Sequence, residues 1–283
     1  MKSETSRGLV LSAPATLYVG LLVAAPLIIL GAYSVWTQTY VSIDRTPTLA
    51  NYREAFGDPL VRFLMIRSIL IAATVTLATV AMAYPIAYFI AFKARRKTLW
   101  LLLITIPFWS SYLLRVFSWK LILGFNGVMN SALLSLGIID EPLMFLLYNE
   151  FAVVLTLAHA WAPFAILPIY VSLQKIDQSL LEAATDLGNG TIQRFLRVTL
   201  PLTVPGIIAA CLIIFIPTVG DYVTPSLVGG SDGKMIANLI QVQFGAANNW
   251  PMGATLSLLA MLAVGFVAIA FVLSASGLGR RIR

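Results

Sequence analysis

Long runs without a charged residue are the feature that most constrains this sequence. They cover residues 8–43, 68–92, 98–114, 151–174, 198–220 and 235–279 of the 283-residue chain. Each run contains or approaches the roughly 20 apolar residues that cross the hydrocarbon core of a bilayer. With 59% hydrophobic and 11% charged residues overall, the chain is predicted to be an all-α integral membrane protein. Its six expected transmembrane helices are 14–36, 68–92, 99–121, 151–173, 202–220 and 252–274.

A seventh uncharged run, residues 121–139, is expected to stay outside the bilayer. Turn-forming and polar residues interrupt it: Gly124, Asn126, Gly127, Asn130 and Gly137. We therefore predict a short surface helix there.

The basic residues indicate the topology. Twelve of the 19 Lys and Arg fall on one side if the six spans hold: those near the N-terminus, in 93–97, in 175–197 and in 280–283. By the positive-inside tendency that side is cytoplasmic, so both termini are expected there. This topology explains the net charge of +7 without a nucleic-acid partner.

The expected domain organisation follows from the spans. We predict a cytoplasmic N-terminal segment at 1–13, a single transmembrane domain at 14–275 and a basic cytoplasmic tail at 276–283. The first apolar run is longer than a typical signal-peptide core, so it is expected to be an uncleaved span.

The sequence offers little for catalysis. "GGSDGKM" (229–235) lacks the first glycine and the final Ser or Thr of a nucleotide-binding P-loop, and "GNGTIQ" (188–193) lacks the third glycine of a dinucleotide site. One histidine and one cysteine do not make a metal cluster. We expect His159 to be buried and hydrogen-bonded rather than a proton relay, and Cys211 to be a small packing residue. No catalytic residue, bound cofactor or metal is expected on this chain.

An amphipathic segment at 175–201 interrupts the apolar pattern. Asp177 can cap a helix from Gln178 to about Leu187, and Gly188 can end it in the left-handed conformation. Surface binding to lipid headgroups would explain its arginines, but not its spacing of Glu, Ala and Gly.

A second short helix is expected after Gly188. Thr191 can cap it, and three apolar residues, Ile192, Phe195 and Leu196, fall on one face. Arg194 and Arg197 mark a neighbouring face. Pro201 and Pro205 are expected to let the chain turn into the next span.

The segment "EAATDLGNGTIQRFLRVTLP" (182–201) resembles the EAA loop of ABC importer permeases. Eight positions carry the resemblance: Glu182, Ala183, Ala184, Gly188, Phe195, Val198, Leu200 and Pro201. In that family the loop is a pair of coupling helices that dock in a groove of the ATP-binding subunit. The resemblance implies a type I importer permease in the bacterial inner membrane, with ATP and Mg bound by a separate ATPase. It implies a coupling role for the eight residues and for Arg194 and Arg197 between them.

Three further stretches, 115–130, 216–244 and 248–262, resemble the B-type permeases of spermidine/putrescine importers. That resemblance implies a polyamine substrate, two ATPase chains, a second and different permease chain, and an external solute-binding protein. The outer loops 37–66, 122–150 and 221–251 are the expected docking surface for the binding protein. Import of another small solute, such as an amino-acid derivative or a phosphonate, stays open, and a secondary transporter or channel is a remote alternative.

A polyamine path requires carboxylates and aromatic faces near the membrane. Asp221 is the preferred cation contact, with Tyr222, Tyr112 and Trp119 as neighbours on the path. Asp221 could instead cap a loop helix or pair with Arg115. Arg115 disfavours a cation, so an anionic or zwitterionic solute is the alternative.

Overall fold

The computed structural model describes residues 2–40 and 42–281, with side chains described for 12–40 and 42–275. The chain forms two compact units, which we treat separately. One unit contains Met1–Arg62 and Leu239–Leu262, and the other contains Phe63–Asn238 and Ala263–Arg283. Helices α3, α11 and α12 contribute residues to both.

The first unit begins with α1 (Lys2–Ser34), followed by an antiparallel hairpin of β1 (Thr37–Thr39) and β2 (Ser42–Asp44), and by α2 (Ala50–Gly57). In this unit, Ser34 at the end of α1 is hydrogen-bonded to two other segments of the chain. The carbonyl of Ser34 accepts hydrogen bonds from Asn51 Nδ2 at 3.2 Å and from Thr255 Oγ1 at 3.1 Å. These bonds satisfy a carbonyl that the end of a helix leaves without an internal partner.

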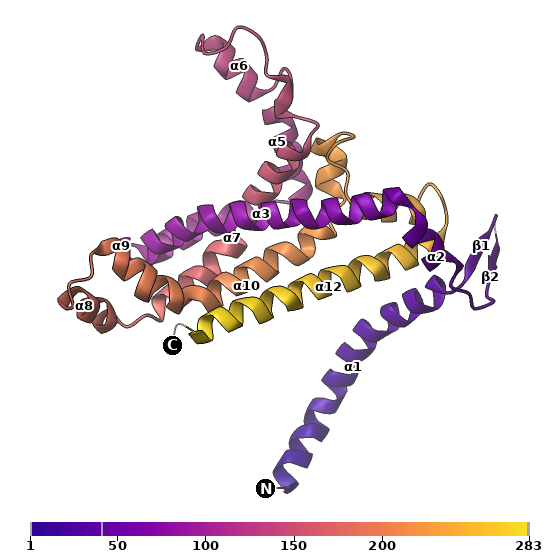
Figure 1. Ribbon diagram of the computed structural model, residues 1–283, viewed down its shortest axis with the longest axis horizontal. Helices are drawn as coiled ribbons and strands as arrows, with labels where there is room; N and C mark the ends of the chain where they lie inside the picture. The colour runs from indigo at the N-terminus through magenta and orange to yellow at the C-terminus, as the bar shows by residue number, and fades with distance from the viewer. Residues whose placement is uncertain (1, 41, 282–283) are drawn as a thin grey trace. The chain divides into compact units, whose positions relative to one another are not determined.

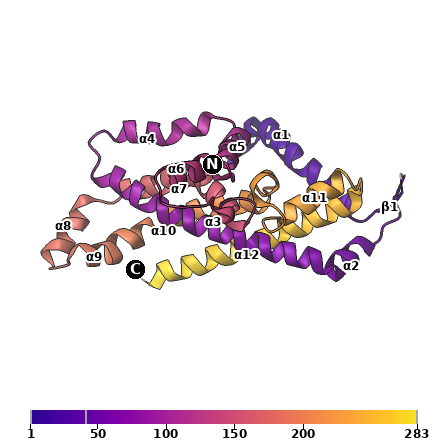
Figure 2. The ribbon, with the colours of Figure 1, turned by 90° about the horizontal axis from the view of Figure 1, so that it is seen from above.

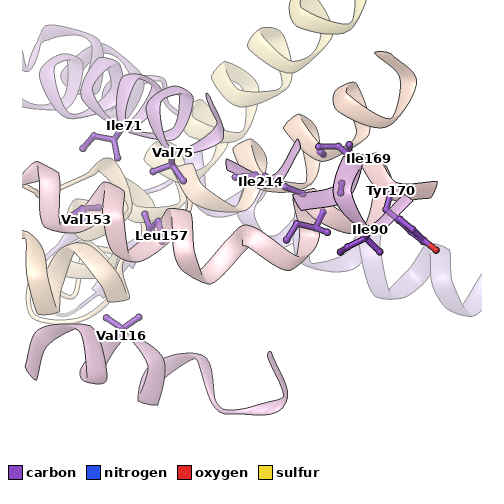
Figure 3. Close-up of a cluster of buried hydrophobic side chains, with 14 of the residues drawn as sticks. Ile71, Val75, Ile90, Val116, Val153, Leu157, Ile169, Tyr170 and Ile214 are labelled. Carbon is purple, nitrogen blue, oxygen red and sulfur yellow. The ribbon is translucent and has the colours of Figure 1, made fainter. Parts of the chain in front are cut away.

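The core of the second unit is formed mainly by α3 (Pro59–Phe92), α5 (Tyr112–Leu123), α7 (Glu150–Gln174) and α10 (Leu200–Val219). Figure 3 shows Ile71 and Val75 of α3 close to Val153 and Leu157 of α7. Buried hydroxyls along these helices donate to the carbonyl four residues earlier, as Thr79 does to Val75 at 2.6 Å and Thr218 to Ile214 at 2.6 Å. Polar side chains are therefore satisfied within an apolar helix.

Five of the six expected spans are confirmed as helices long and apolar enough to cross a membrane. Among the described residues these are Ser12–Ser34, Pro59–Phe92, Glu150–Gln174, Thr191–Val219 and Trp250–Ala275. The second span begins earlier than the predicted residue 68. Its first turns carry Arg67, which lies 3.9 Å from Glu150 and places its guanidinium over the Phe63 ring. An arginine with these partners is compatible with a helix interior, so counting charges started this span too late.

The prediction of one continuous third span, 99–121, was wrong. The structure has α4 (Lys97–Thr105), a 3₁₀ turn at Ile106–Trp109 and then α5, with an 89° bend between the two halves. Pro107 lacks an amide hydrogen, and Ser110 and Ser111 are extended, so the helical hydrogen bonds stop there. Figure 2 shows a loop leading from α3 to α4, which is drawn as a separate helix. Phe89 of α3 and Trp100 of α4 stack edge to face.

The run 121–139 contains a short helix, as predicted. Helix α5 ends at Leu123 and α6 (Val128–Ser135) begins after Gly127, and Figure 1 shows α5 leading away to α6. A Cβ on Gly127 would lie 2.5 Å from the carbonyl oxygen of Leu121, so this turn requires glycine. The remaining elements are η2 (Met144–Leu146), α8 (Gln178–Asp186), α9 (Thr191–Arg194), η3 (Phe195–Thr199), η4 (Pro225–Gly229), α11 (Ile236–Phe244) and α12 (Trp250–Arg281).

Candidate functional site

The coupling segment, residues 175–201, contains α8 and α9, which Figure 1 shows near one end of α10. Asp177 caps α8 as predicted, because its carboxylate accepts a hydrogen bond from the amide of Ser179 at 3.0 Å. The same hydrogen bond lowers the pKa of Asp177. The first helix of the segment is thus specified by its own sequence.

Gly188 ends α8 in the left-handed conformation, with φ of +80°, as the sequence indicated. Its amide donates to the carbonyl of Thr185 at 2.9 Å, and the amide of Asn189 donates to the carbonyl of Ala184 at 3.1 Å. This pair of bonds is a Schellman motif, which satisfies the last carbonyls of a helix. The direction in which the chain leaves α8 therefore depends on Gly188.

Two arginines form hydrogen bonds between the second half of the coupling segment and the first. Arg194 of α9 bonds to α8, and Arg197 of the following π turn bonds to the residue after Gly188. Arg194 Nη1 donates to Thr185 Oγ1 at 3.0 Å, and Arg197 Nη1 donates to Asn189 Oδ1 at 3.3 Å. Both bonds are exposed, so each contributes modestly. Their geometry nevertheless shows that these cations help to hold the segment together.

The predicted cap of the second helix was wrong. Gly190, not Thr191, occupies the N-cap position of α9, and the Thr191 side chain makes no capping hydrogen bond. The three apolar residues differ in their surroundings: Ile192 is 75% exposed, whereas Phe195 packs edge to face against Tyr84 of α3. Helical spacing groups residues on one surface, but tertiary packing selected only Phe195 for the interior.

The expected turn at Pro201 is absent. Helix α9, the π turn η3 and α10 form one helical span, Thr191–Val219. The amide of Leu200 donates to the carbonyl of Phe195, five residues earlier, and the π turn ends immediately before Pro201. Pro201 lacks an amide hydrogen, so it donates no helical hydrogen bond, and the helix continues past it after the i to i−5 bond of Leu200. The chain therefore enters the span through a π turn.

A cleft of about 350 Å³ separates part of α8 from the end of α3. Its charged lining residues are Lys93, Glu182, Asp186 and Arg194. Glu182 and Ala183 are exposed, whereas Ala184 is 6% exposed. The Glu-Ala-Ala sequence of the segment thus combines an exposed carboxylate with a buried methyl group.

Of the five residues predicted for a solute path, Asp221 and Tyr112 are in direct contact. Asp221 Oδ2 accepts a hydrogen bond from the Tyr112 hydroxyl at 2.5 Å, and Oδ1 accepts from the amide of Val223 at 2.9 Å. The Tyr112 oxygen also lies 2.6 Å from Thr224 Oγ1, a partner that sequence reasoning missed. Asp221 therefore does cap the turn that follows it, which is the structural alternative to a cation contact. Its neighbour Tyr222 is 48% exposed.

Arg115 does not pair with Asp221 among the described side chains, so that alternative was wrong. The guanidinium lies 4.9 Å from the centre of the Phe108 ring and 5.9 Å from that of Tyr112, and Nη1 donates to the carbonyl of Ala160 at 3.4 Å. Its buried Nε has no hydrogen-bond partner among the described residues.

Trp119 lies two turns along α5 from Tyr112 and contacts His159. Trp119 Nε1 donates to His159 Nδ1 at 3.1 Å, and their rings are 5.4 Å apart. His159 is hydrogen-bonded as predicted, but it is exposed rather than buried. Trp119 therefore belongs to a contact with α7 that is separate from the Asp221 contacts.

An apolar, multi-span helical chain that carries this coupling segment is the permease subunit of an ABC importer. The chain belongs to the family described as "Binding-protein-dependent transport system inner membrane component", whose profile matches residues 5–283. It is a multi-pass protein of the bacterial inner membrane.

Two relatives and one solved structure place the chain within this family. It is 37% identical over 225 residues, 79% of this chain and 81% of the relative, to the spermidine/putrescine transport system permease protein PotB of Escherichia coli (strain K12). It is 33% identical over 246 residues, 82% of this chain and 77% of the relative, to the inner membrane ABC transporter permease protein YdcU of the same strain. A chain of a bacterial alginate ABC transporter has the same fold, with a TM-score of 0.73 at 17% identity, covering 100% of this chain and 98% of that chain.

Proposed function

We propose that this permease imports polyamines such as spermidine and putrescine. The observation that carries the proposal is the 37% identity, over 79% of this chain, to a permease named for spermidine/putrescine transport. The carboxylate of Asp221, with Tyr112 and Tyr222 beside it, supplies the charge and aromatic surface that an alkylammonium requires. Tyr112, Trp119 and Arg115 then lie along or beside the path.

A second candidate is an anionic or zwitterionic solute. The position of Arg115 supports it, because the buried Nε lacks an acceptor among the described residues. A carboxylate or phosphonate would provide one. The two candidates differ in the charge of the solute, so one uptake experiment separates them.

The proposed assembly has two ATPase chains, a second and different permease chain and an external solute-binding protein. The coupling segment docks on the ATPase, which binds ATP and Mg, while this chain binds no cofactor. The termini and the coupling segment lie on the cytoplasmic side, and loops 37–66, 122–150 and 221–251 face the binding protein.

Uptake of labelled solutes tests the substrate. In a strain that lacks this gene and any redundant polyamine importer, we expect spermidine and putrescine uptake to be lost and to return with the wild-type gene. Unchanged polyamine uptake in the deletion strain would exclude them as substrates. Uptake of a zwitterionic amino-acid derivative and of a phosphonate, measured in the same strains, would then identify the second candidate.

The exposed apolar residues of the coupling segment are the proposed ATPase contact. Leu187 is 83% exposed and Ile192 is 75% exposed. We expect Ile192→Asp to reduce the ATPase that co-purifies with this chain by roughly tenfold, because an apolar contact would be replaced by a desolvated charge. Leu49→Asp is the matched control, because Leu49 is likewise exposed, at 68%, but lies outside the coupling segment, directly before α2. Equal ATPase recovery from both variants would place the contact elsewhere.

A further inference from the structure

We propose that Phe195, held between Tyr84 and Tyr88, transmits movement of the coupling segment to α3. Its ring is 5.6 Å from the Tyr84 ring and 6.3 Å from the Tyr88 ring, and both pairs meet edge to face. Such pairs stabilise a contact beyond the area they bury. The inference rests on the proposed docking of the coupling segment on an ATPase, and it assigns positioning roles to two tyrosines outside that segment.

The aromatic contact extends along α3. Tyr88 also packs against Phe92, with ring centres 4.9 Å apart, and Tyr84, Tyr88 and Phe92 all pack against the buried core of the second unit. A displacement of Phe195 therefore acts on side chains that are already fixed to the core. On the side of the core these rings are closely packed and pass on such a displacement, while Tyr88 and Phe92 also line the cleft of about 350 Å³ beside α8.

A hydrogen bond fixes the same contact from the other side of the π turn. Tyr84 Oη and Thr203 Oγ1 are 2.9 Å apart. Thr203 Oγ1 already donates to the carbonyls of Thr199 and Leu200, at 3.0 and 2.9 Å, so the Tyr84 hydroxyl is the donor to Thr203. Tyr84 thus contacts both the first residue of the π turn, Phe195, and Thr203 of α10, which follows the turn.

The π turn supplies the flexible joint that this arrangement requires. Residues Phe195–Thr199 form i to i−5 hydrogen bonding, and Pro201 and Pro205 reduce the number of amides in the next turns of the helix. The helix is therefore irregular where the coupling segment continues into α10. The contact between the coupling segment and α3, in comparison, is made by packed aromatic rings. We infer that α3 receives the motion through the aromatic contact, and that the Tyr84–Thr203 hydrogen bond joins α3 to α10 across the π turn.

The test uses the complete importer, purified through a tag on this chain and reconstituted with its binding protein in vesicles. Three quantities are measured: the ATPase subunit retained, the ATP hydrolysed and the labelled spermidine taken up. For Phe195→Ala and for Tyr88→Leu, we expect retained ATPase and continued hydrolysis, with uptake per ATP reduced by about tenfold. Tyr84→Phe keeps the ring and removes the hydrogen bond, so a smaller reduction is expected.

Phe89→Leu is the matched control, because Phe89 also lies on α3 and stacks edge to face, but on Trp100. Its uptake per ATP should equal that of the wild type. Wild-type uptake per ATP in both Phe195→Ala and Tyr88→Leu would overturn the inference, as would loss of the ATPase subunit from either variant, which would indicate a docking role.

A wild-type complex without an ATPase subunit would instead overturn the proposed docking, and a wild-type complex that hydrolyses ATP without moving spermidine would overturn the substrate. If spermidine is not moved, uptake per ATP is measured with the labelled amino-acid derivative and with the labelled phosphonate instead.

Discussion

Replacing Gly188 by valine is expected to reduce solute uptake to below about a tenth of the wild-type rate while the membrane helices stay folded. Gly188 has φ of +80°, a conformation that costs an L-residue roughly 1–2 kcal/mol and a β-branched residue more. A Cβ placed there meets no atom within 4 Å, so the effect comes from the backbone and not from a clash. The valine would displace the chain that leaves α8 and misdirect the proposed contact with the ATPase.

Gly190→Val is the control for this experiment. Gly190 lies two residues further on, also with open space around its Cβ position, but with φ of −65° and ψ of 168°, which valine adopts readily. Gly188→Asn should recover part of the uptake, because asparagine tolerates the left-handed conformation. Uptake is compared at equal membrane levels, with helicity measured by circular dichroism. Normal uptake by the Gly188→Val variant would remove the coupling role from this segment.

Replacing Asp221 by asparagine is expected to reduce polyamine uptake by at least about tenfold. Asparagine keeps an oxygen that can accept from the amide of Val223, so the cap remains, but the charge that would attract an ammonium is lost. A hydrogen bond to a charged group contributes about 1.5–3 kcal/mol, and 1.4 kcal/mol corresponds to a factor of ten. The measurement is the initial rate of spermidine uptake as a function of concentration.

Two companion variants separate charge from structure. Asp221→Ala removes both the cap and the bond from Tyr112, whereas Tyr112→Phe removes only the hydroxyl and leaves the carboxylate in place. We expect a smaller loss for Tyr112→Phe than for Asp221→Asn. If Asp221→Asn transports normally and Asp221→Ala does not, Asp221 is a structural cap and the cation contact lies elsewhere.

The sequence by itself determined the membrane class, the positions of five spans and the local form of α8. These features depend on neighbouring residues: uncharged runs set the spans, Asp177 begins α8, and Gly188 ends it. The eight-position spacing of the coupling segment also indicated the family to which the chain belongs. Each signal is contained within a few helical turns, so no tertiary contact is needed to interpret it.

The tertiary structure alone decided which side chains meet. Tyr84 and Thr203 are 119 residues apart in sequence, and Tyr112 and Asp221 are 109 apart, so no local periodicity pairs them. The break at Ser110 and the inward position of Phe195 were missed for a related reason. An apolar run has the same composition whether its helix is straight or bent. Residues on one helical face differ in burial only when a neighbouring helix packs against one of them, and local sequence does not show which one.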